Sequence, residues 1–275
     1  MEKKVLMFHR DAVCYNSVNF FSERIADGLH KHHIAVKWLD ITTDSQQLSF
    51  NLTELIQENK FNAAIAVNAV GQELYRLNGN NLYDELGIPF FNLLLDHPTA
   101  HLSSLTQGPT DYRVICIDRE HKAYIDRYLS NIKSTYFIPL GPSANNDIED
   151  DFETYMEREI DLLFTGANKR LDKIEEDILN LPPLGRSIVT EEIEYFLDNR
   201  DMSLDKVLYN VLKARGIDSD DTKEYFNYSV TLLPAQQYCM AYLREEIIRY
   251  LIASGINLYL CGDGWEEIIS DYSAQ

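Results

Sequence analysis

Short apolar segments alternate with amphipathic segments from the N-terminus to about residue 140. Nearly continuous apolar runs are typical of strands that are buried on both faces of a sheet. The pattern predicts such strands at 4–9, 34–41, 62–70, 89–95, 113–117 and 134–140. Between them, apolar residues spaced by three or four predict helices. These helices are expected at 18–30, over a stretch that ends near 60, and from 118 to about 131. The alternation predicts an α/β fold with a parallel sheet.

The pattern changes after residue 140. Pro139, Gly141 and Pro142 oppose both helix and strand, so they mark a domain boundary. Beyond an acidic stretch, apolar strand-like runs begin at Asp161 and at Ile256, and almost everything between them has helical spacing. Helices are predicted there at 171–181, 190–199, 204–214 and 236–253. We therefore predict an N-terminal α/β domain over 1–142, an acidic linker over 143–160, and a partial α/β domain over 161–275 with a helical block at 171–254.

Composition narrows the class of protein. Of the 275 residues, 45% are hydrophobic and 25% are charged, which suits a packed globular protein. No apolar run reaches the length of a membrane span, so none is predicted. The four cysteines form no Cys-x-x-Cys pair, which favours a reduced, cytoplasmic protein over a disulfide framework or a zinc site.

The formal net charge of −19 argues against nucleic acid as a partner, because binding to phosphate backbones depends on clustered Lys and Arg. Most of the acidic stretches are expected to form a solvated surface. The acidic helices also leave open a protein partner, which would make the chain a binding module and not an enzyme.

The loop after the first predicted strand carries a polar set. In parallel sheets, ligands collect at the carboxyl ends of the strands. This loop lacks Gly-x-Gly-x-x-Gly, so a dinucleotide cradle is not expected there. Its side chains suit hydroxylated or anionic groups, and the candidates are His9, Arg10, Asn16 and Asn19. Alternatively, Ser17 or Asn19 only caps the following helix.

Asp96 and His97 follow the fourth predicted strand directly, and Pro98 fixes the backbone after them. A carboxylate that hydrogen-bonds an imidazole fixes its tautomer and raises its basicity, which suits a general base. The alternative is that Asp96 only caps the short helix that follows. His97 and His101 are four residues apart, but Pro98 interrupts the helix between them, so no metal site is predicted.

The second domain offers two glycine-containing turns. Gly166 is followed by Lys169 and Arg170, and Gly262 is followed by Trp265. Glycine lets a backbone approach a phosphate closely, and arginine can pair with phosphate through two hydrogen bonds. Plain tight turns would explain the same residues.

The order of these segments resembles GT-B glycosyltransferases, and most closely the bacterial CgeB-like (spore-maturation type) group. The segments that carry the resemblance are the N-terminal α/β unit, Phe137–Gly141, Asp161–Gly166 and Leu258–Trp265. The resemblance implies a Rossmann-like acceptor-side domain, a second domain for a nucleotide sugar, and catalysis without a metal. No other cofactor is implied.

The resemblance implies transfer of a sugar from a nucleotide-sugar donor to a hydroxyl of a glycan, protein or small molecule. Asp96 or His97 would act as the base or orient the acceptor, beside the polar loop of residues 9–19. On the donor side, the resemblance places Gly166, Arg170, Gly262 and Trp265. Two departures from the family pattern are the long helical block and the lack of a counterpart to the later donor-binding region. This chain alone is therefore expected to hold an incomplete donor site.

Two other functions stay open on the sequence. The first is a non-enzymatic protein-binding module derived from a glycosyltransferase fold, which the acidic helices favour. The second is a different cytoplasmic α/β enzyme with Asp96 and His97 at its centre.

Overall fold

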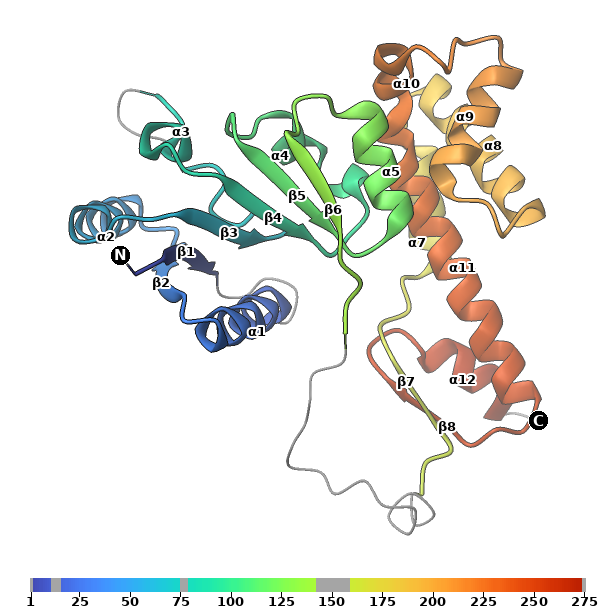
Figure 1. The fold of residues 1–275 in the computed structure, drawn as a ribbon. Helices are drawn as coiled ribbons and strands as arrows, with labels where there is room; N and C mark the ends of the chain where they lie inside the picture. Colours follow the sequence, from blue (N-terminus) through green and yellow to red (C-terminus); the bar gives the residue numbers. More distant parts are fainter. Residues whose placement is uncertain (1, 11–15, 75–78, 142–158, 274–275) are drawn as a thin grey trace. The chain divides into compact units, whose positions relative to one another are not determined.

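The computed structural model describes residues 2–10, 16–74, 79–141 and 159–273, and the chain divides into two compact units (Figure 1). The first unit is Met1–Gly141 and the second is Pro142–Gln275. Residues 11–15 of the polar loop and most of the acidic linker at 143–160 lie outside the described residues.

The first unit is built on a six-stranded sheet with the order β2-β1-β3-β4-β5-β6, in which all neighbouring strands are parallel. The strands are β1 (Lys4–His9), β2 (Ala35–Asp40), β3 (Ala63–Val67), β4 (Phe90–Leu94), β5 (Tyr112–Cys116) and β6 (Ser134–Phe137). This sheet confirms the α/β fold class that the alternation of segments predicts.

Helices connect these strands. They are α1 (Ser17–Lys31), α2 (Ser45–Glu58), α3 (Leu82–Leu86), the 3₁₀ helix η2 (Pro98–His101), α4 (Leu102–Thr106) and α5 (Arg119–Tyr128). The helix expected from residue 118 is α5, and the Asp118 carboxylate caps it by accepting a hydrogen bond from the Glu120 amide at 2.7 Å. The pattern does not predict α3, because its five residues are too short for a helical period to be recognised.

Each face of the sheet has its own core because side chains alternate along a strand. On one face Val5 and Met7 pack with Ala26 of α1. On the other face Phe8 meets Tyr83 and Phe90 edge to face or tilted, with ring centroids 6.4 and 6.5 Å apart. The core of the first unit therefore continues on both sides of β1.

The strand order contains one reversal. The chain passes from β1 outward to β2 and then returns to β3 on the other side of β1. In open parallel sheets, ligands bind beside the carboxyl ends of the strands at such a switch point. Here the ends that meet there are His9 of β1 and Val67 of β3.

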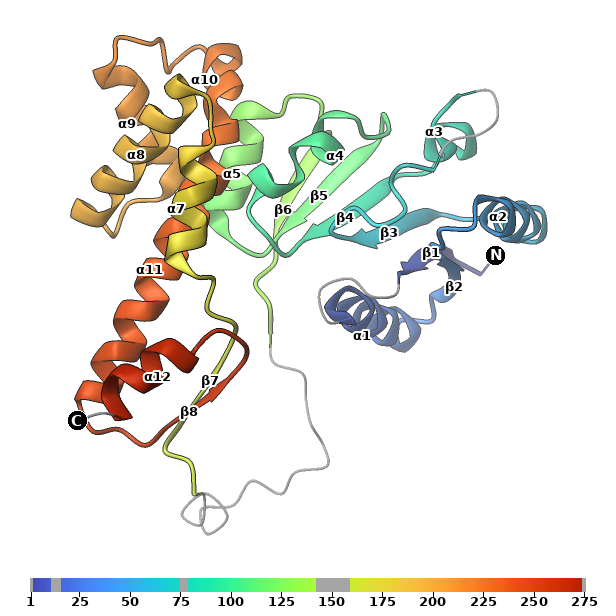
Figure 2. The same ribbon diagram turned by 180° about the vertical axis from the view of Figure 1, so that it is seen from behind.

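The second unit is a helical region with a small parallel sheet of β7 (Leu162–Thr165) and β8 (Leu258–Cys261). Its helices are α7 (Leu171–Leu179), α8 (Pro183–Asp198), α9 (Leu204–Ala214), α10 (Thr222–Tyr228), η3 (Ser229–Thr231), α11 (Leu232–Ala253) and α12 (Glu266–Ser273). The long helix α11 packs against α7, α8 and α9, as Figure 2 shows from behind.

Two helices of this unit begin earlier than predicted. The apolar spacing predicts starts at residues 190 and 236, whereas α8 begins at Pro183 and α11 at Leu232. Proline has no amide hydrogen and a fixed φ, so it is tolerated in the first turn of a helix, where that hydrogen has no partner anyway. Pro183 is therefore the first residue of α8 and still separates it from α7, and Pro234 lies in the first turn of α11.

Two clusters contribute to the core of the second unit. One joins α7, α8 and α11 through Ile174, Val189 and Ala235, with their neighbours. The other packs Ile248 and Trp265 against one face of the β7–β8 sheet. Within the described part of the chain, no helix is both long and apolar enough to cross a bilayer.

Candidate functional site

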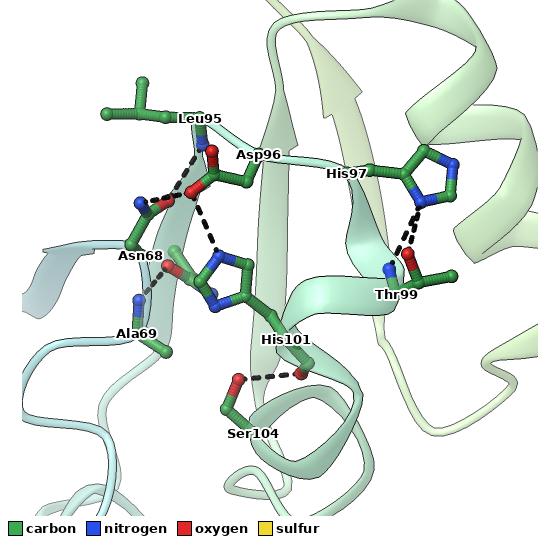
Figure 3. A network of polar contacts seen from close by, with 9 residues as sticks. Asn68, Ala69, Leu95, Asp96, His97, Thr99, His101 and Ser104 are labelled. Carbon is green, nitrogen blue, oxygen red and sulfur yellow. Dashed lines mark hydrogen bonds and ion pairs between the residues drawn. The ribbon is translucent and has the colours of Figure 1, made fainter. Parts of the chain in front are cut away.

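A strained turn follows β3. Asn68 and Ala69 have φ values of 48° and 61°, a left-handed conformation that costs free energy for residues other than glycine. Three hydrogen bonds hold the turn: Leu95 N to Asn68 Oδ1 at 2.9 Å, Asn68 Nδ2 to Asp96 Oδ2 at 2.9 Å, and Ala69 N to Asn92 Oδ1 at 2.8 Å. Figure 3 shows this network. Strain that the surrounding structure enforces in this way is characteristic of functional sites.

Asp96 pairs with His101. The distance from His101 Nε2 to Asp96 Oδ2 is 3.4 Å, and the carboxylate also accepts the hydrogen bond from Asn68 (Figure 3). The hydrogen bond with His101 is the main reason that the pKa of Asp96 lies below its usual value, while partial burial opposes this shift. Asp96 is therefore ionised at neutral pH, and its carboxylate can orient the His101 ring.

His97 faces a different set of groups. Its Nδ1 accepts a hydrogen bond from the Thr99 amide at 3.3 Å and lies 2.8 Å from Thr99 Oγ1, so His97 caps η2. Burial is the main cause that lowers the pKa of His97 to about 4, with a further contribution from the nearby His121, so the ring is neutral at pH 7. One alternative from the sequence was that Asp96 caps this short helix. The residue that caps it is His97.

The expected hydrogen bond between Asp96 and His97 is therefore replaced by one between Asp96 and His101. Successive residues of an extended segment point to opposite sides, so Asp96 and His97 diverge as they leave β4. The turn of η2 brings His101 back toward Asp96. Spacing alone could not show this, because it depends on the path of the backbone after Pro98.

A pocket of about 440 Å³ lies beside this network at the switch point of the sheet. Its apolar lining includes Ile41, Leu48, Val70 and Leu74. Its polar lining includes Arg10, Asn68, Gln72, Glu73, His101 and Ser103. The size and the mixed lining are those of a small-molecule site.

Of the four residues predicted to bind an acceptor, Arg10 lines this pocket. The side chains of Asn16 and Asn19 hold the start of the loop. Asn19 is buried, its Oδ1 accepts from the Arg10 amide at 2.9 Å, and its Nδ2 donates to Asn16 Oδ1 at 2.7 Å. Neither side chain caps α1, since Asn16 at the N-cap position makes no capping hydrogen bond.

His9, the fourth of these residues, is not among the residues that line the pocket. Its ring stacks on Trp38 with a centroid separation of 3.9 Å and an angle of 9° between the planes. Its Nδ1 lies 3.5 Å from Asp40, and its Nε2 lies 3.8 Å from Glu23 of α1. His9 thus links the ends of β1 and β2 to α1.

Gln72 and Ser103 line the pocket but carry no sequence signal that distinguishes them from ordinary loop residues. Gln72 is 1% exposed, and its Nε2 donates to the Ser104 carbonyl at 2.8 Å. His101 stood out in the sequence only as a possible metal ligand. The signal that identifies all three is their position beside the end of β3, which requires the fold.

In the second unit, the two glycine turns lie back to back. Gly166 N donates to the Cys261 carbonyl at 2.8 Å, and a Cβ atom on Gly262 would lie 2.5 Å from the Gly166 oxygen. Both glycines have positive φ, 150° and 142°. Trp265 is 2% exposed, and its indole Nε1 donates to the Gly166 carbonyl at 2.7 Å. These contacts give Gly262 and Trp265 a structural role, and their predicted donor-binding role stays a prediction.

Arg170 makes two ion pairs, with Asp172 at 2.8 Å and with Glu267 at 2.9 Å. A donor phosphate at Arg170 would have to compete with these two carboxylates. Over the ranges that the structure describes, no group of three His, Cys, Asp or Glu side chains is placed to hold a metal ion.

The fold and the site define the first unit as a Rossmann-like α/β domain with a polar pocket at its switch point. No protein-family model matches the chain, and neither a curated protein nor a solved structure matches it. The geometry of the pocket is therefore the basis on which a function can be assigned.

Proposed function

We propose that the chain is a glycosyltransferase of the GT-B type, or the N-terminal portion of one, and that its first unit binds the acceptor. The observation that carries this proposal is the Asp96–His101 pair beside a pocket of acceptor size. The parallel sheet, with its switch point at this pocket, supports it. The order of segments along the chain supports it as well.

In the proposed reaction, an acceptor hydroxyl enters the pocket and gives its proton to Nδ1 of His101. The hydroxyl oxygen forms a bond to the anomeric carbon of the nucleotide sugar, and the bond from that carbon to the diphosphate breaks. Asp96, already ionised, stabilises the imidazolium through Nε2. Proton transfer to a positioned base of this kind contributes about 10²–10⁴-fold to a rate.

The second unit would supply the donor-side groups. The Gly166 and Gly262 turns bring backbone amides close together at the carboxyl ends of β7 and β8. Arg170 would contribute its charge to the leaving diphosphate, after exchange of its carboxylate partners. Trp265 would support the Gly166 turn through its hydrogen bond to the Gly166 carbonyl.

The test is a screen of uridine, guanosine, thymidine and cytidine diphosphate sugars, with nucleotide release as the readout of turnover. With an active donor, we expect His101→Gln to lower kcat by about 10²–10⁴-fold. Asp96→Asn should lower it less, because the base remains. His97→Asn should have little effect, because asparagine is also a good N-cap.

Two results would count against this proposal. One is the failure of every nucleotide sugar to stabilise the protein in a thermal shift assay or to turn over. The other is the reverse order of effects, with His97→Asn inactive and His101→Gln active, which would restore the pairing expected from the sequence.

A non-enzymatic protein-binding module is the second candidate. It is favoured by the exposed apolar side chains of α11, where Met240, Ile247 and Tyr250 are 45%, 53% and 71% exposed. Under this alternative the protein turns over no donor, and binding of a partner protein is lost in Ile247→Asp but retained in Asp96→Asn.

A further inference from the structure

Arg10 differs from most arginines of the described structure in its surroundings. The chain has 44 Asp and Glu but only 25 Lys and Arg, so carboxylates are in excess. Arg24 pairs with Asp27 at 3.3 Å and Arg113 with Asp111 at 2.8 Å. The Arg10 guanidinium lines the pocket and makes no ion pair with any residue of the described ranges. A cation of this kind in a pocket is suited to an anionic ligand.

The backbone of Arg10 is fixed although its side chain is exposed. Its amide donates to the buried Asn19 side chain at 2.9 Å, and Asn19 in turn donates to Asn16. The residue also follows directly on β1, a central strand of the sheet. The guanidinium therefore extends from a rigid point at the switch point, where ligands of parallel sheets bind.

Uncharged side chains that can form hydrogen bonds also line the pocket. The Gln72 Nε2 donates to the Ser104 carbonyl, and because a carbonyl can only accept, this bond fixes which end of the amide is oxygen. Among the residues that the structure describes, none donates a hydrogen bond to the Oε1 of Gln72. Ser103 adds a hydroxyl that can both donate and accept.

One carboxylate, Glu73, also lines the pocket and sets a limit on the ligand. It would repel an anion placed beside it, but it would accept a hydrogen bond from a hydroxyl. A ligand that suits both Arg10 and Glu73 therefore carries its negative charge at one end and hydroxyl groups at the other.

We propose that this pocket binds a small polyhydroxylated anion. Its carboxylate or phosphate pairs with Arg10, and its hydroxyls are bound by Glu73, Ser103 and, after a small side-chain movement, Gln72. The volume of about 440 Å³ suits a single sugar ring with its acidic substituent. That this anion is the acceptor rests on the proposed function. The binding itself requires no donor and no turnover.

The test is a titration of the whole chain with glucose 6-phosphate, glucuronate and glucose, followed by calorimetry. We expect at least one of the two anions to bind about tenfold or more tightly than glucose, since hydrogen bonds to charged groups are the stronger ones. The phosphate and the carboxylate arms show which anion is preferred. This advantage should decrease as salt is added, because the Arg10 side chain is exposed.

Two matched pairs of variants assign the effect to the pocket. Arg10→Gln should abolish the preference for the anion, whereas Arg24→Gln makes the same change in net charge elsewhere in the first unit and should retain it. Gln72→Met should weaken binding of all three sugars. The control is Asn131→Leu. It also removes a hydrogen bond from a side-chain amide to a backbone carbonyl, that of Leu105 beside Ser104, but it should leave binding unchanged.

The proposal is overturned if none of the three compounds binds, if glucose binds as tightly as both anions, or if Arg10→Gln and Arg24→Gln lose affinity equally. Each of these outcomes is independent of the glycosyltransferase proposal, which is judged by turnover. Conversely, anion binding that depends on Arg10 in a protein without turnover would retain this pocket and remove the proposed reaction.

Discussion

At the scale of single residues, Asn92 connects the core of the first unit to its candidate site. It is fully buried on β4, where its Oδ1 accepts from the Ala69 amide and its Nδ2 donates to the Tyr112 hydroxyl, each at 2.8 Å. Burial raises the pKa of Tyr112, so this hydroxyl stays protonated. One amide thus holds both the strained turn after β3 and a buried hydroxyl on β5.

We expect Asn92→Leu to destabilise the protein by about 2–4 kcal/mol, because it removes the hydrogen-bond partners of the partly buried Ala69 amide and of the buried Tyr112 hydroxyl. Urea denaturation measures this change. Tyr112→Phe removes only the second of the two bonds and should cost about 1 kcal/mol. If Asn92→Leu is as stable as the parent protein, the turn at Ala69 does not depend on this side chain.

The residues of the site were only partly predictable. Arg10 and Asp96 could be found because they directly follow apolar strands, and in parallel sheets such positions share one edge. The partner of Asp96 could not be found, because His101 reaches it through the turn of η2. The structural role of Trp265 could not be found either, because its packing against Ile248 in the core is not visible in the spacing of the glycines beside it.

At the scale of elements, α8 carries an unusual group. Glu192 faces the core of the second unit and is fully buried, and its carboxyl accepts a hydrogen bond from Thr231 Oγ1 at 3.2 Å. Burial raises its pKa from 4.5 to about 8, against the effect of the Thr231 bond. The nearby Cys239 is buried as well, which is the main reason that its pKa is raised to about 12. At neutral pH the helical region therefore holds a protonated carboxyl group.

The stability of the second unit should consequently fall as the pH rises from about 5 to 8. In that range the unfolded chain has lost the Glu192 proton while the folded chain retains it, so each added pH unit favours the unfolded state by up to about 1.4 kcal/mol. Glu192→Gln has no proton to lose and should flatten this dependence, as measured by urea denaturation at several pH values. Glu194→Gln, an exposed position on the same helix, serves as the control and should keep the slope of the parent.

Helices and strands were predictable to different degrees. The predicted strand at 4–9 has the bounds of β1, and the other predicted strands of the first unit overlap the observed ones, because buried apolar runs are a strong local signal. The short helices α3 and α10 have five and seven residues and gave no clear period. The predicted starts of α8 and α11 are too late, because a proline is typical both of a helix break and of the first turn of a helix.

At the scale of the whole molecule, the first unit has what a domain needs to fold alone. Its sheet is covered by its own helices, and its core forms on both faces of β1. We expect a fragment of residues 1–141 to unfold in one cooperative transition in urea, as domains of this size usually do. Circular dichroism would follow the transition. A fragment without helical signal, or with a gradual loss of it, would show that the first unit depends on the second.

The distribution of the two tryptophans has a consequence for experiments in solution. Trp38 lies partly exposed in the first unit beside His9, and Trp265 lies in the core of the second. Each unit therefore contains its own fluorescent reporter, and the buried indole should emit at the shorter wavelength. Trp38→Phe and Trp265→Phe would each leave one reporter, so that unfolding and ligand binding can be followed in either unit of the intact chain.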